Sequence, residues 1–460
     1  MAGNLLVPEL PTVNLRMGCI RPTIIYRRYK TMKAIKAVRG TRDLLPPETE
    51  LWNHIETTVR RVFGRYCFGE IRTPIFEDTQ LFARGVGEET DIVSKEMYTW
   101  EDRARAQSEK AQSLTLRPEN TAGVVRAYIE HNLGETGLLQ KLYYIGPQFR
   151  RERPQKGRYR QFFQIGAEVI GPASAGSESP LRDAEMLEML VTLLQELAIQ
   201  DWKLYLNSVG SAEDRPRYVQ ALREALKNIA PKLCGDCQRR AETNPLRVLD
   251  CKVPEDQQWI ETLPKIADYL DESSKAHFSQ VCAALDACGV AYTVNSRLVR
   301  GLDYYTRTTF EFVHGGLGAQ NALLGGGRYD GLSEAIGGPK APGIGFAIGA
   351  DRLVLTLQGQ QGTTATVTLA DVYIAPLGEA QQAQALILAR ELRHAGLRVE
   401  LGDGTFRIKK SFETGNRLAR RIVLFGEEEA QSGIVTVKDF ASGMQTKVPR
   451  AELAAVLQQK

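Results

Sequence analysis

The sequence lacks any long hydrophobic run, because charged or polar residues interrupt every stretch of about 18 residues, the length at which a spanning helix becomes possible. We therefore expect no integral membrane segment. Net charge is also small, since 59 basic residues face 55 acidic residues. Any nucleic-acid partner must then be bound by a local basic patch and not by the field of the whole molecule.

Cysteine is scarce and odd in number, with seven residues in 460, and no apolar secretory segment stands at the start of the chain. Both features favour reduced thiols and a cytoplasmic location. Residues 1–31 lack serine and carry five basic residues against one acid, Glu9. We interpret them as an N-terminal extension, either disordered or caused by a start placed before Met32. A transit peptide ranks last, because such peptides are rich in serine.

The composition allows a large core, with 43% hydrophobic and 25% charged residues, and the length suggests about two to four domains. No repeat at solenoid or propeller periods is present, which excludes those folds. Apolar residues recur at helical spacing from Glu48 to Tyr66 and predict an amphipathic helix. Ile71 to Phe76 and Ser94 to Thr99 are predicted as short strands.

Two strands around a basic loop are predicted at Lys141–Arg150 and Gln161–Ile170. In the second strand, alternation places Phe163, Ile165, Ala167 and Val169 on an apolar face, and Phe162, Gln164, Gly166 and Glu168 on the other. The loop from Arg150 to Arg160 holds six basic residues and one acid. It therefore resembles an anion-binding cradle, although a solvated polar face remains the alternative.

The chain divides into parts by composition. We expect a catalytic domain over residues 32–358, with a charged helical insertion at about 211–278 and a glycine-dense tract from Gly315 to Gly349. Residues 359–369 have the composition of a linker. Strand, helix and strand then alternate, which predicts a separate small α/β domain over residues 370–460.

Three motifs in this order resemble histidyl-tRNA synthetases, which are class II aminoacyl-tRNA synthetases. They are Thr115–Gly123 with Tyr144–Phe162, then Leu298–Tyr305, which is similar to the histidine-specific motif, and Gly343–Arg352, which is similar to class II motif 3. The resemblance implies an α+β fold, with an antiparallel sheet flanked by helices, a helical insertion and a C-terminal α/β anticodon-binding domain. The implied activity is ATP-dependent ligation of L-histidine to tRNA(His) through a histidyl-adenylate.

The resemblance also implies residue roles. Arg150, Arg158 and Arg352 would bind ATP, and Arg300 would bridge the histidine carboxylate and the α-phosphate, so that Arg150, Arg300 and Arg352 are the catalytic candidates. The implied histidine-binding residues are Glu119, Thr121, Gln164, Glu168, Arg300, Tyr304, Tyr305 and Tyr329. An ion pair with Asp303 is the alternative for Arg300. Mg²⁺ would accompany ATP, but Asp351 stands where many class II enzymes have glutamate, which puts a metal role there in doubt.

For tRNA, the resemblance assigns the acceptor end to Arg153, Gln155, Lys156 and Arg160. Basic residues also cluster in the last domain, where a solvated helix face is the alternative: Arg407, Lys409, Lys410, Arg417, Arg420 and Arg421. Ile71 to Gly87 resembles class II motif 1, an interface element, which implies a homodimer.

A zinc site is the remaining metal hypothesis. Cys234 and Cys237 form a Cys-x-x-Cys pair, with Cys251 beyond them. Three thiols without a well-spaced fourth ligand are a weak signal, and His277 is remote in sequence. We expect structural thiols and no zinc.

Other functions fit less well. A regulatory paralogue that binds histidine would characteristically lack the anticodon domain and depart from the histidine motif, and both are present here. A noncatalytic tRNA sensor fused to a kinase would carry His-Arg-Asp and Asp-Phe-Gly, which are absent. A class II synthetase for glycine, proline or threonine would not carry the Arg300–Tyr305 motif.

Overall fold

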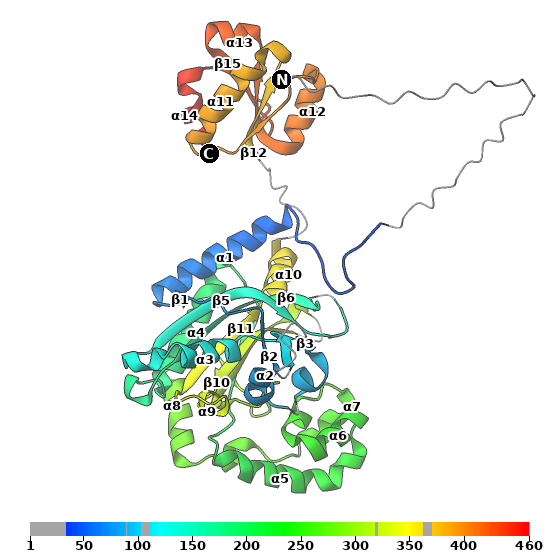
Figure 1. The fold of residues 1–460 in the computed structure, drawn as a ribbon, viewed down its shortest axis with the longest axis vertical. Coiled ribbons are helices and arrows are strands. Elements are labelled where there is room, and N and C mark those ends of the chain that lie inside the picture. The colour runs from blue at the N-terminus through cyan, green and yellow to red at the C-terminus, as the bar shows by residue number, and fades with distance from the viewer. Residues whose placement is uncertain are drawn as a thin grey trace, which may run out of the picture. The chain divides into compact units, whose positions relative to one another are not determined.

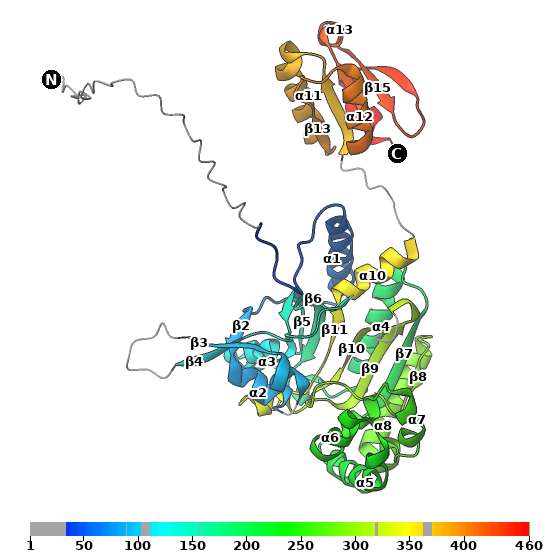
Figure 2. The same ribbon diagram turned by 90° about the vertical axis from the view of Figure 1, so that its right-hand side faces the viewer.

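The computed structural model describes residues 34–88, 90–102, 111–155, 157–317, 321–361 and 370–459 (Figures 1 and 2). The expected extension at 1–31 and Lys156 lie outside the described residues. The predicted start of the linker at residue 359 is wrong, because residues 359–361 are the end of a helix, and residues 362–369 lie outside the described residues. A search of the described ranges for helices long and apolar enough to cross a membrane finds none.

An eight-stranded sheet forms the body of the catalytic part. Its strands, in spatial order, are β1 (Gly69–Glu70), β5 (Gln140–Phe149), β6 (Gln161–Ile170), β11 (Gly343–Gly349), β10 (Ala322–Arg328), β9 (Thr306–His314), β7 (Trp202–Ser208) and β8 (Thr293–Val294). Neighbours run antiparallel except at the two edges, where β1 pairs with β5 and β8 with β7 in parallel. The predicted hairpin is therefore confirmed as β5 and β6, and the antiparallel fold class is confirmed with it.

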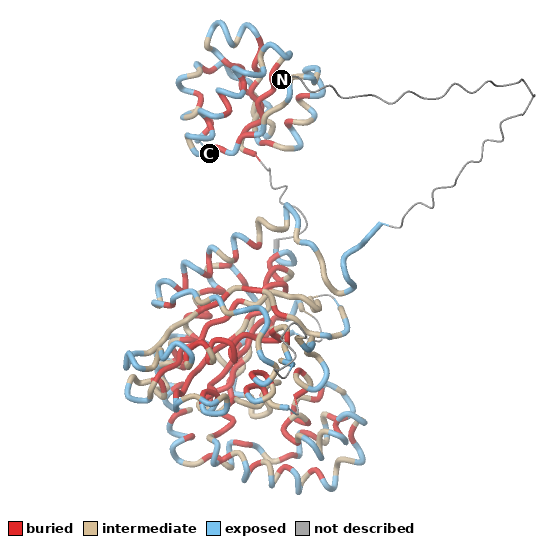
Figure 3. The backbone as a smooth tube through the Cα atoms, viewed as in Figure 1, coloured by how far each residue is buried: buried red, intermediate tan, exposed pale blue. Residues whose placement is uncertain are grey.

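Helices cover one face of this sheet and enclose the main core. They are α1 (Glu48–Arg65), α4 (Pro180–Glu196), α8 (Glu272–Ala287) and α10 (Ala350–Gln361). The predicted helix from Glu48 is confirmed, and its apolar stripe is buried. Ile165, Ala167 and Val169 of β6 lie in the same core, as the alternation predicted. Figure 3 shows the buried residues concentrated along the middle strands. The opposite face of β6, which carries Gln164 and Glu168, is therefore not covered by these helices.

A smaller three-stranded sheet of β2 (Phe76–Asp78), β4 (Gln112–Leu116) and β3 (Tyr98–Asp102) lies near α2 (Thr79–Val86) and α3 (Thr121–Glu130). The predicted strand at Ile71–Phe76 is wrong over residues 71–75, whose carbonyls at Thr73 and Pro74 accept from Arg117 at 3.0 and 3.2 Å. The predicted strand from Ser94 begins only at Tyr98, because residues 92–96 form a π-helical turn.

The insertion has a hydrophobic core of its own, from Val209 to Leu270 together with Tyr305. Its elements are α5 (Asp214–Ile229), α6 (Gly235–Thr243), the 3-10 turn η5 (Pro245–Asp250) and α7 (Pro254–Ile260). The stretch between α5 and α7, which holds Cys234, Cys237 and Cys251, thus contains a helix and a 3-10 turn, and the predicted helical insertion is confirmed. A short helix α9 (Leu332–Ala335) follows β10.

The C-terminal part forms a five-stranded sheet in the order β13 (Val399–Leu401), β12 (Ala370–Pro376), β14 (Ala419–Phe425), β15 (Ile434–Asp439) and β16 (Gln445–Pro449). Its helices are α11 (Gln382–His394), α12 (Ile408–Leu418), α13 (Glu427–Ser432) and α14 (Arg450–Gln458). Parallel pairing of β12 with β13 and β14 confirms the predicted strand–helix alternation.

Candidate active site

A cavity of about 710 Å³ lies over the sheet face that the core helices leave free. Residues from distant parts of the sequence line it, among them the start of α3, the β5–β6 hairpin, the segment before β9, β10, and β11 with the start of α10. The predicted residues on its wall are Glu119, Thr121, Arg150, Arg158, Gln164, Arg300, Tyr304, Tyr305, Tyr329, Asp351 and Arg352. The three motifs therefore converge on one cavity.

Glu168 lies directly behind this wall and is fully buried. Its carboxylate accepts a hydrogen bond from the Thr121 hydroxyl at 2.8 Å and another from the Tyr329 hydroxyl at 2.8 Å. Burial raises the pKa of Glu168 to about 8, although these hydrogen bonds oppose the rise. A ligand donor that passes between Thr121 and Tyr329 could therefore form a hydrogen bond with the Glu168 carboxyl group and stabilise its ionised form.

Gly345 makes room for Glu168. The two residues are paired across β6 and β11, and a Cβ atom at Gly345 would lie 1.5 Å from the Glu168 Oε2. No side chain can occupy that position while Glu168 keeps its place. The glycine of motif 3 is therefore required for close approach and not for a turn.

Glu119 supplies a second buried acid, which also contacts Thr121. Its carboxylate accepts from the backbone N–H groups of Thr121 and Ala122 at 2.7 and 3.0 Å, at the start of α3. Burial raises the pKa of Glu119. Two buried carboxyl groups next to one cavity favour a ligand that carries a cationic group.

Tyrosines close the cavity near these acids. The ring of Tyr304 lies 4.7 Å from that of Tyr305 and 5.9 Å from that of Tyr329, measured between centroids. Burial raises the pKa of all three phenols, so they remain neutral hydrogen-bond donors. The predicted pocket walls are thus brought together, with Tyr329 bound to Glu168.

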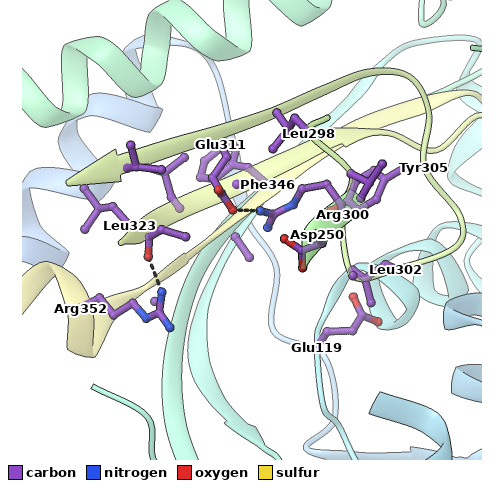
Figure 4. A pocket seen from close by; sticks show the side chains of 18 of the residues that line it. Glu119, Asp250, Leu298, Arg300, Leu302, Tyr305, Glu311, Leu323, Phe346 and Arg352 are labelled. Carbon is purple, nitrogen blue, oxygen red and sulfur yellow. Dashed lines mark hydrogen bonds and ion pairs between the residues drawn. The ribbon is translucent and has the colours of Figure 1, made fainter. Parts of the chain in front are cut away.

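Arg300 forms an ion pair with Glu311 of β9, shown in Figure 4. Its guanidinium also lies over Gly325 of β10, where a Cβ atom would come within 2.6 Å of it. The alternative of an Arg300–Asp303 ion pair is wrong, because the Asp303 carboxylate instead accepts from Asn244 at 3.3 Å. Arg300 therefore points into the cavity from the segment before β9.

The basic loop contributes Arg150 and Arg158 to the same cavity. Arg150 stacks over the Phe162 ring, with its guanidinium carbon 5.2 Å from the ring centroid, and donates to the Pro118 carbonyl at 2.9 Å. Arg158 donates to Glu152 at 2.8 Å. These contacts hold two planar guanidinium groups at the cavity wall, suited to phosphate oxygens.

Arg352 reaches the cavity from the first turn of α10 and donates to the Ala322 carbonyl (Figure 4). Burial lowers its pKa. The neighbouring Asp351 uses both carboxylate oxygens elsewhere, accepting from Arg42 at 3.0 Å and from the Phe163 N–H at 3.1 Å. Asp351 thus fixes the start of α10 on β6.

Three buried polar atoms of the wall residues have no hydrogen-bond partner among the described residues: the Gln164 Oε1, the Tyr144 hydroxyl and the Arg300 Nε. Buried polar atoms are rarely left unpaired in a protein. A bound ligand with a hydrogen-bond donor would satisfy the amide oxygen of Gln164.

The predicted site residues did not include several polar residues of the cavity, among them Tyr144, Asp250 and Glu311. Alternation in the sequence places Tyr144 on the polar face of its strand with Arg150, but no role was assigned to it. Glu311 is a lone acid between Phe310 and Phe312, both fully buried in the core, and the same alternation would have placed it on the cavity face. Asp250 belongs to the insertion, and no local pattern singled it out.

The predicted tRNA contacts lie elsewhere. Arg153 and Gln155 are exposed in the β5–β6 loop, and Arg160 donates to the Arg39 carbonyl at 3.2 Å. In the C-terminal part, Arg421 is committed to Asp439 and to carbonyls of the last helix and the residue after it. The remaining predicted basic residues there are exposed: Arg407, Lys409, Lys410, Arg417 and Arg420.

Comparison with known proteins gives matches for both parts of the chain. The family model described as Histidyl-tRNA synthetase matches residues 40–353, and the model described as Anticodon binding domain matches residues 371–460. The chain is 71% identical to a histidine–tRNA ligase of Koribacter versatilis, over 91% of this chain and 95% of that protein. It is 57% identical to one from Solibacter usitatus, over 92% and 99%.

Among solved structures, the apo histidyl-tRNA synthetase of S. aureus matches with a TM-score of 0.75 and 37% identity, over 93% of this chain and all of that one. The matched segments contain the three motifs, the cavity that they line and the small C-terminal domain. The chain belongs to the histidyl-tRNA synthetase family.

Proposed function

We propose that this chain ligates L-histidine to tRNA(His) in two steps, forming a histidyl-adenylate from ATP and then transferring the histidyl group to the tRNA. The observation that carries the proposal is one cavity that joins the four predicted arginines to the buried Glu119 and the unpaired amide oxygen of Gln164, with Glu168 directly behind its wall. Relatives of this identity are histidine–tRNA ligases. Histidine-dependent exchange of pyrophosphate into ATP tests it, with the other amino acids as controls. Histidine binding without exchange would indicate a regulatory paralogue instead.

Histidine recognition is assigned to the acid-rich end of the cavity. The α-ammonium group would lie against Glu119, Thr121 and Gln164, which supply a negative charge and two oxygen acceptors. The imidazole would reach Glu168 at one ring nitrogen and Tyr305 at the other, with Tyr304 and Tyr329 as walls. A ring with one acceptor and one donor nitrogen fits such a pair of partners.

Selectivity follows from that pairing. A pocket that hydrogen-bonds both ring nitrogens rejects a near isostere by roughly 10⁴ to 10⁵, because the unmatched buried polar groups lose their partners. The pocket would therefore need no separate editing step.

The arginines are assigned to adenylation. The histidine carboxylate attacks the α-phosphorus, a new P–O bond forms, and the bond to the β-phosphate oxygen breaks so that pyrophosphate leaves. Negative charge grows on the α-phosphate oxygens, where Arg150 and Arg300 would stabilise it, and on the departing phosphates, where Arg352 and Arg158 would do so. Arginine remains protonated and can hold two oxygens at once.

Magnesium would accompany ATP and neutralise charge on its phosphates. Asp351 fits this role poorly, because both its oxygens are used by Arg42 and the Phe163 N–H. The cavity offers Glu311, Glu152 and Asp250 as carboxylates. Of these, Glu311 is the best candidate, because it lies on the sheet face and its ion pair with Arg300 uses only one of its two carboxylate oxygens.

The acceptor end of tRNA is assigned to Arg153, Gln155, Lys156 and Arg160. The exposure of Arg153 and Gln155 supports the assignment. The basic surface of α12 is assigned to the anticodon arm, through phosphate contacts.

We further propose the division of the chain into a catalytic domain at 32–358 and an anticodon-binding domain at 370–460, and a homodimer in the cytoplasm. The matched residue ranges of the two family models support the division. Light scattering on the purified protein tests the dimer, and a mass of one chain, near 51.2 kDa, would contradict it.

A further inference from the structure

Four potential metal ligands meet in the helical insertion, away from the residues assigned to histidine and ATP. Cys234 directly precedes α6, Cys237 lies in its first turn, Cys251 follows η5, and Asp256 lies in α7. One ligand atom from each residue lies within 4.8 Å of all the others. Cys237, Cys251 and Asp256 are buried and Cys234 is half-buried.

The spacing of these atoms fits a tetrahedral ion. Cys234 Sγ lies 3.9 Å from Cys251 Sγ, and Cys251 Sγ lies 3.2 Å from Asp256 Oδ2. A tetrahedral zinc ion with Zn–S bonds of about 2.3 Å places its sulfur ligands roughly 3.8 Å apart. The expectation of no zinc rested on a missing fourth ligand. Asp256, five residues beyond Cys251, supplies one.

The charge balance also favours a cation. Asp256 is 2% exposed, and its carboxylate partners among the described residues are the Cys234 N–H and the Cys251 thiol, with no basic side chain. Buried carboxylates are normally paired with a cation or coordinate a metal.

We propose that Cys234, Cys237, Cys251 and Asp256 bind one zinc ion that ties α6, η5 and α7 together. Three thiolates favour a soft or borderline ion, and the carboxylate favours zinc over Cu(I). A set of four protein ligands leaves no open position, as in structural zinc sites. The ion would also hold η5, whose Arg247 and Asp250 line the active-site cavity.

Metal analysis of the purified full-length protein tests the site. We expect about one zinc per chain after dialysis, and a loss of at least about tenfold in bound zinc for Cys251→Ser and for Asp256→Asn. Cys288→Ser is the matched control, since Cys288 is exposed and outside the cluster, and it should keep its zinc. Strong chelation should lower the Tm of the wild type and of Cys288→Ser alike.

Measurements on the wild-type protein alone test whether the cluster binds zinc, even if a variant fails to fold. After zinc removal, added Co²⁺ should give the thiolate-to-cobalt absorption of a tetrahedral site, and zinc should abolish it. Wild-type protein with no bound metal and no cobalt band would overturn the proposal, leaving the cluster as packed thiols. A Cys234–Cys251 disulfide found by mass spectrometry of the native protein would also overturn it.

Discussion

At the scale of single residues, the proposed histidine specificity depends most on Glu168. Its carboxylate is fully buried, bound by Thr121 and Tyr329, and separated from the cavity by those two side chains. The unliganded carboxyl keeps its proton up to about pH 8, but a ligand N–H that donates to it would favour the ionised form. The resulting hydrogen bond is then made to a charged group in a medium of low polarity. Such bonds contribute about 1.5–3 kcal/mol.

Glu168→Gln should therefore raise the KM for histidine by roughly 10- to 100-fold in pyrophosphate exchange, which is the hydrogen-bond energy expressed as an affinity ratio. The KM for ATP should change little, because the arginines are untouched. Glu334→Gln is the control, since Glu334 is exposed on α9. Unchanged histidine kinetics in Glu168→Gln would refute the role assigned to Glu168.

The same variant should alter how stability depends on pH. The pKa of Glu168 is about 8 in the folded protein, against 4.5 for an ordinary glutamate. Between these values the folded state keeps a proton that the unfolded state has lost, so the free energy of unfolding falls as pH rises, by up to about 1.4 kcal/mol per unit. Glutamine does not titrate, so Glu168→Gln should lack this pH-dependent loss of stability.

Denaturant unfolding of both proteins from pH 5 to 9 would measure this pH dependence of the free energy of unfolding. The free energy of unfolding of Glu168→Gln, relative to the wild type, should increase up to about pH 8 and then stay constant. The relative stability of Glu334→Gln should not rise in that way. A difference between Glu168→Gln and the wild type that is independent of pH would mean that Glu168 is ionised throughout.

Arg300→Lys should lower the kcat of pyrophosphate exchange by about 10²–10³-fold, the usual cost of losing one preorganised donor to developing charge. Lysine keeps the charge but cannot hold two oxygens in one plane. Arg60→Lys on the outer side of α1 is the matched control. Full activity in Arg300→Lys would leave Arg300 as a structural partner of Glu311 only.

At the scale of secondary-structure elements, β11 is constrained by the side chain that it faces. Gly345→Ala should displace Glu168, because the new methyl group would lie 1.5 Å from its Oε2. We expect a destabilisation of about 1–3 kcal/mol from overpacking, together with loss of histidine-dependent exchange. Denaturant unfolding and exchange assays measure the two effects.

Gly359→Ala is the matched control for this substitution. Gly359 lies in α10, and a methyl group there would meet no atom within 4 Å beyond the helix's own backbone. Alanine should keep full activity there and add up to about 1 kcal/mol of stability, because it is the better helix former. An active, stable Gly345→Ala would show that Glu168 can move without cost.

The elements also show why sequence patterns succeed or fail. The β5–β6 hairpin was predictable because one face of each strand packs on the core and the other faces the cavity, which produces a period of two. Residues 71–75 begin and end with isoleucine, which suggested a strand, but Pro74 has no N–H to donate. In addition, the distant Arg117 binds the carbonyls of Thr73 and Pro74 that a neighbouring strand would have bound. A contact of that kind leaves no local signal.

At the scale of the whole molecule, the three sequence motifs predicted the residues of the cavity because each motif is a short contiguous segment that forms part of the cavity wall. The fourth ligand of the cysteine cluster was missed for the opposite reason. Asp256 follows Cys251 closely, but it lies 22 residues from Cys234, whose N–H it accepts. Only the fold of α6, η5 and α7 brings them together.

The two functional parts of the chain should be separable by assay. Adenylation needs only the cavity residues, whereas charging also needs tRNA, which we assign in part to α12. Replacing Lys409, Lys410 and Arg417 by alanine removes three exposed positive charges from α12. We expect unchanged pyrophosphate exchange and a raised KM for tRNA in aminoacylation.

Salt dependence distinguishes phosphate contact from a solvated helix face. Each lost phosphate contact should reduce the slope of log affinity against log salt by about 0.7–0.9, so the triple variant should show a visibly shallower slope if these residues contact the phosphate backbone of the tRNA.

Arg421→Ala is not a suitable control, because Arg421 binds Asp439 and carbonyls near the C-terminus, and its loss would destabilise the domain. Lys447→Ala is a better one, since Lys447 is an exposed charge on β16 outside the basic cluster. If the triple variant and Lys447→Ala give the same slope as the wild type, the basic surface of α12 is solvated, and recognition of tRNA must rest on the β5–β6 loop.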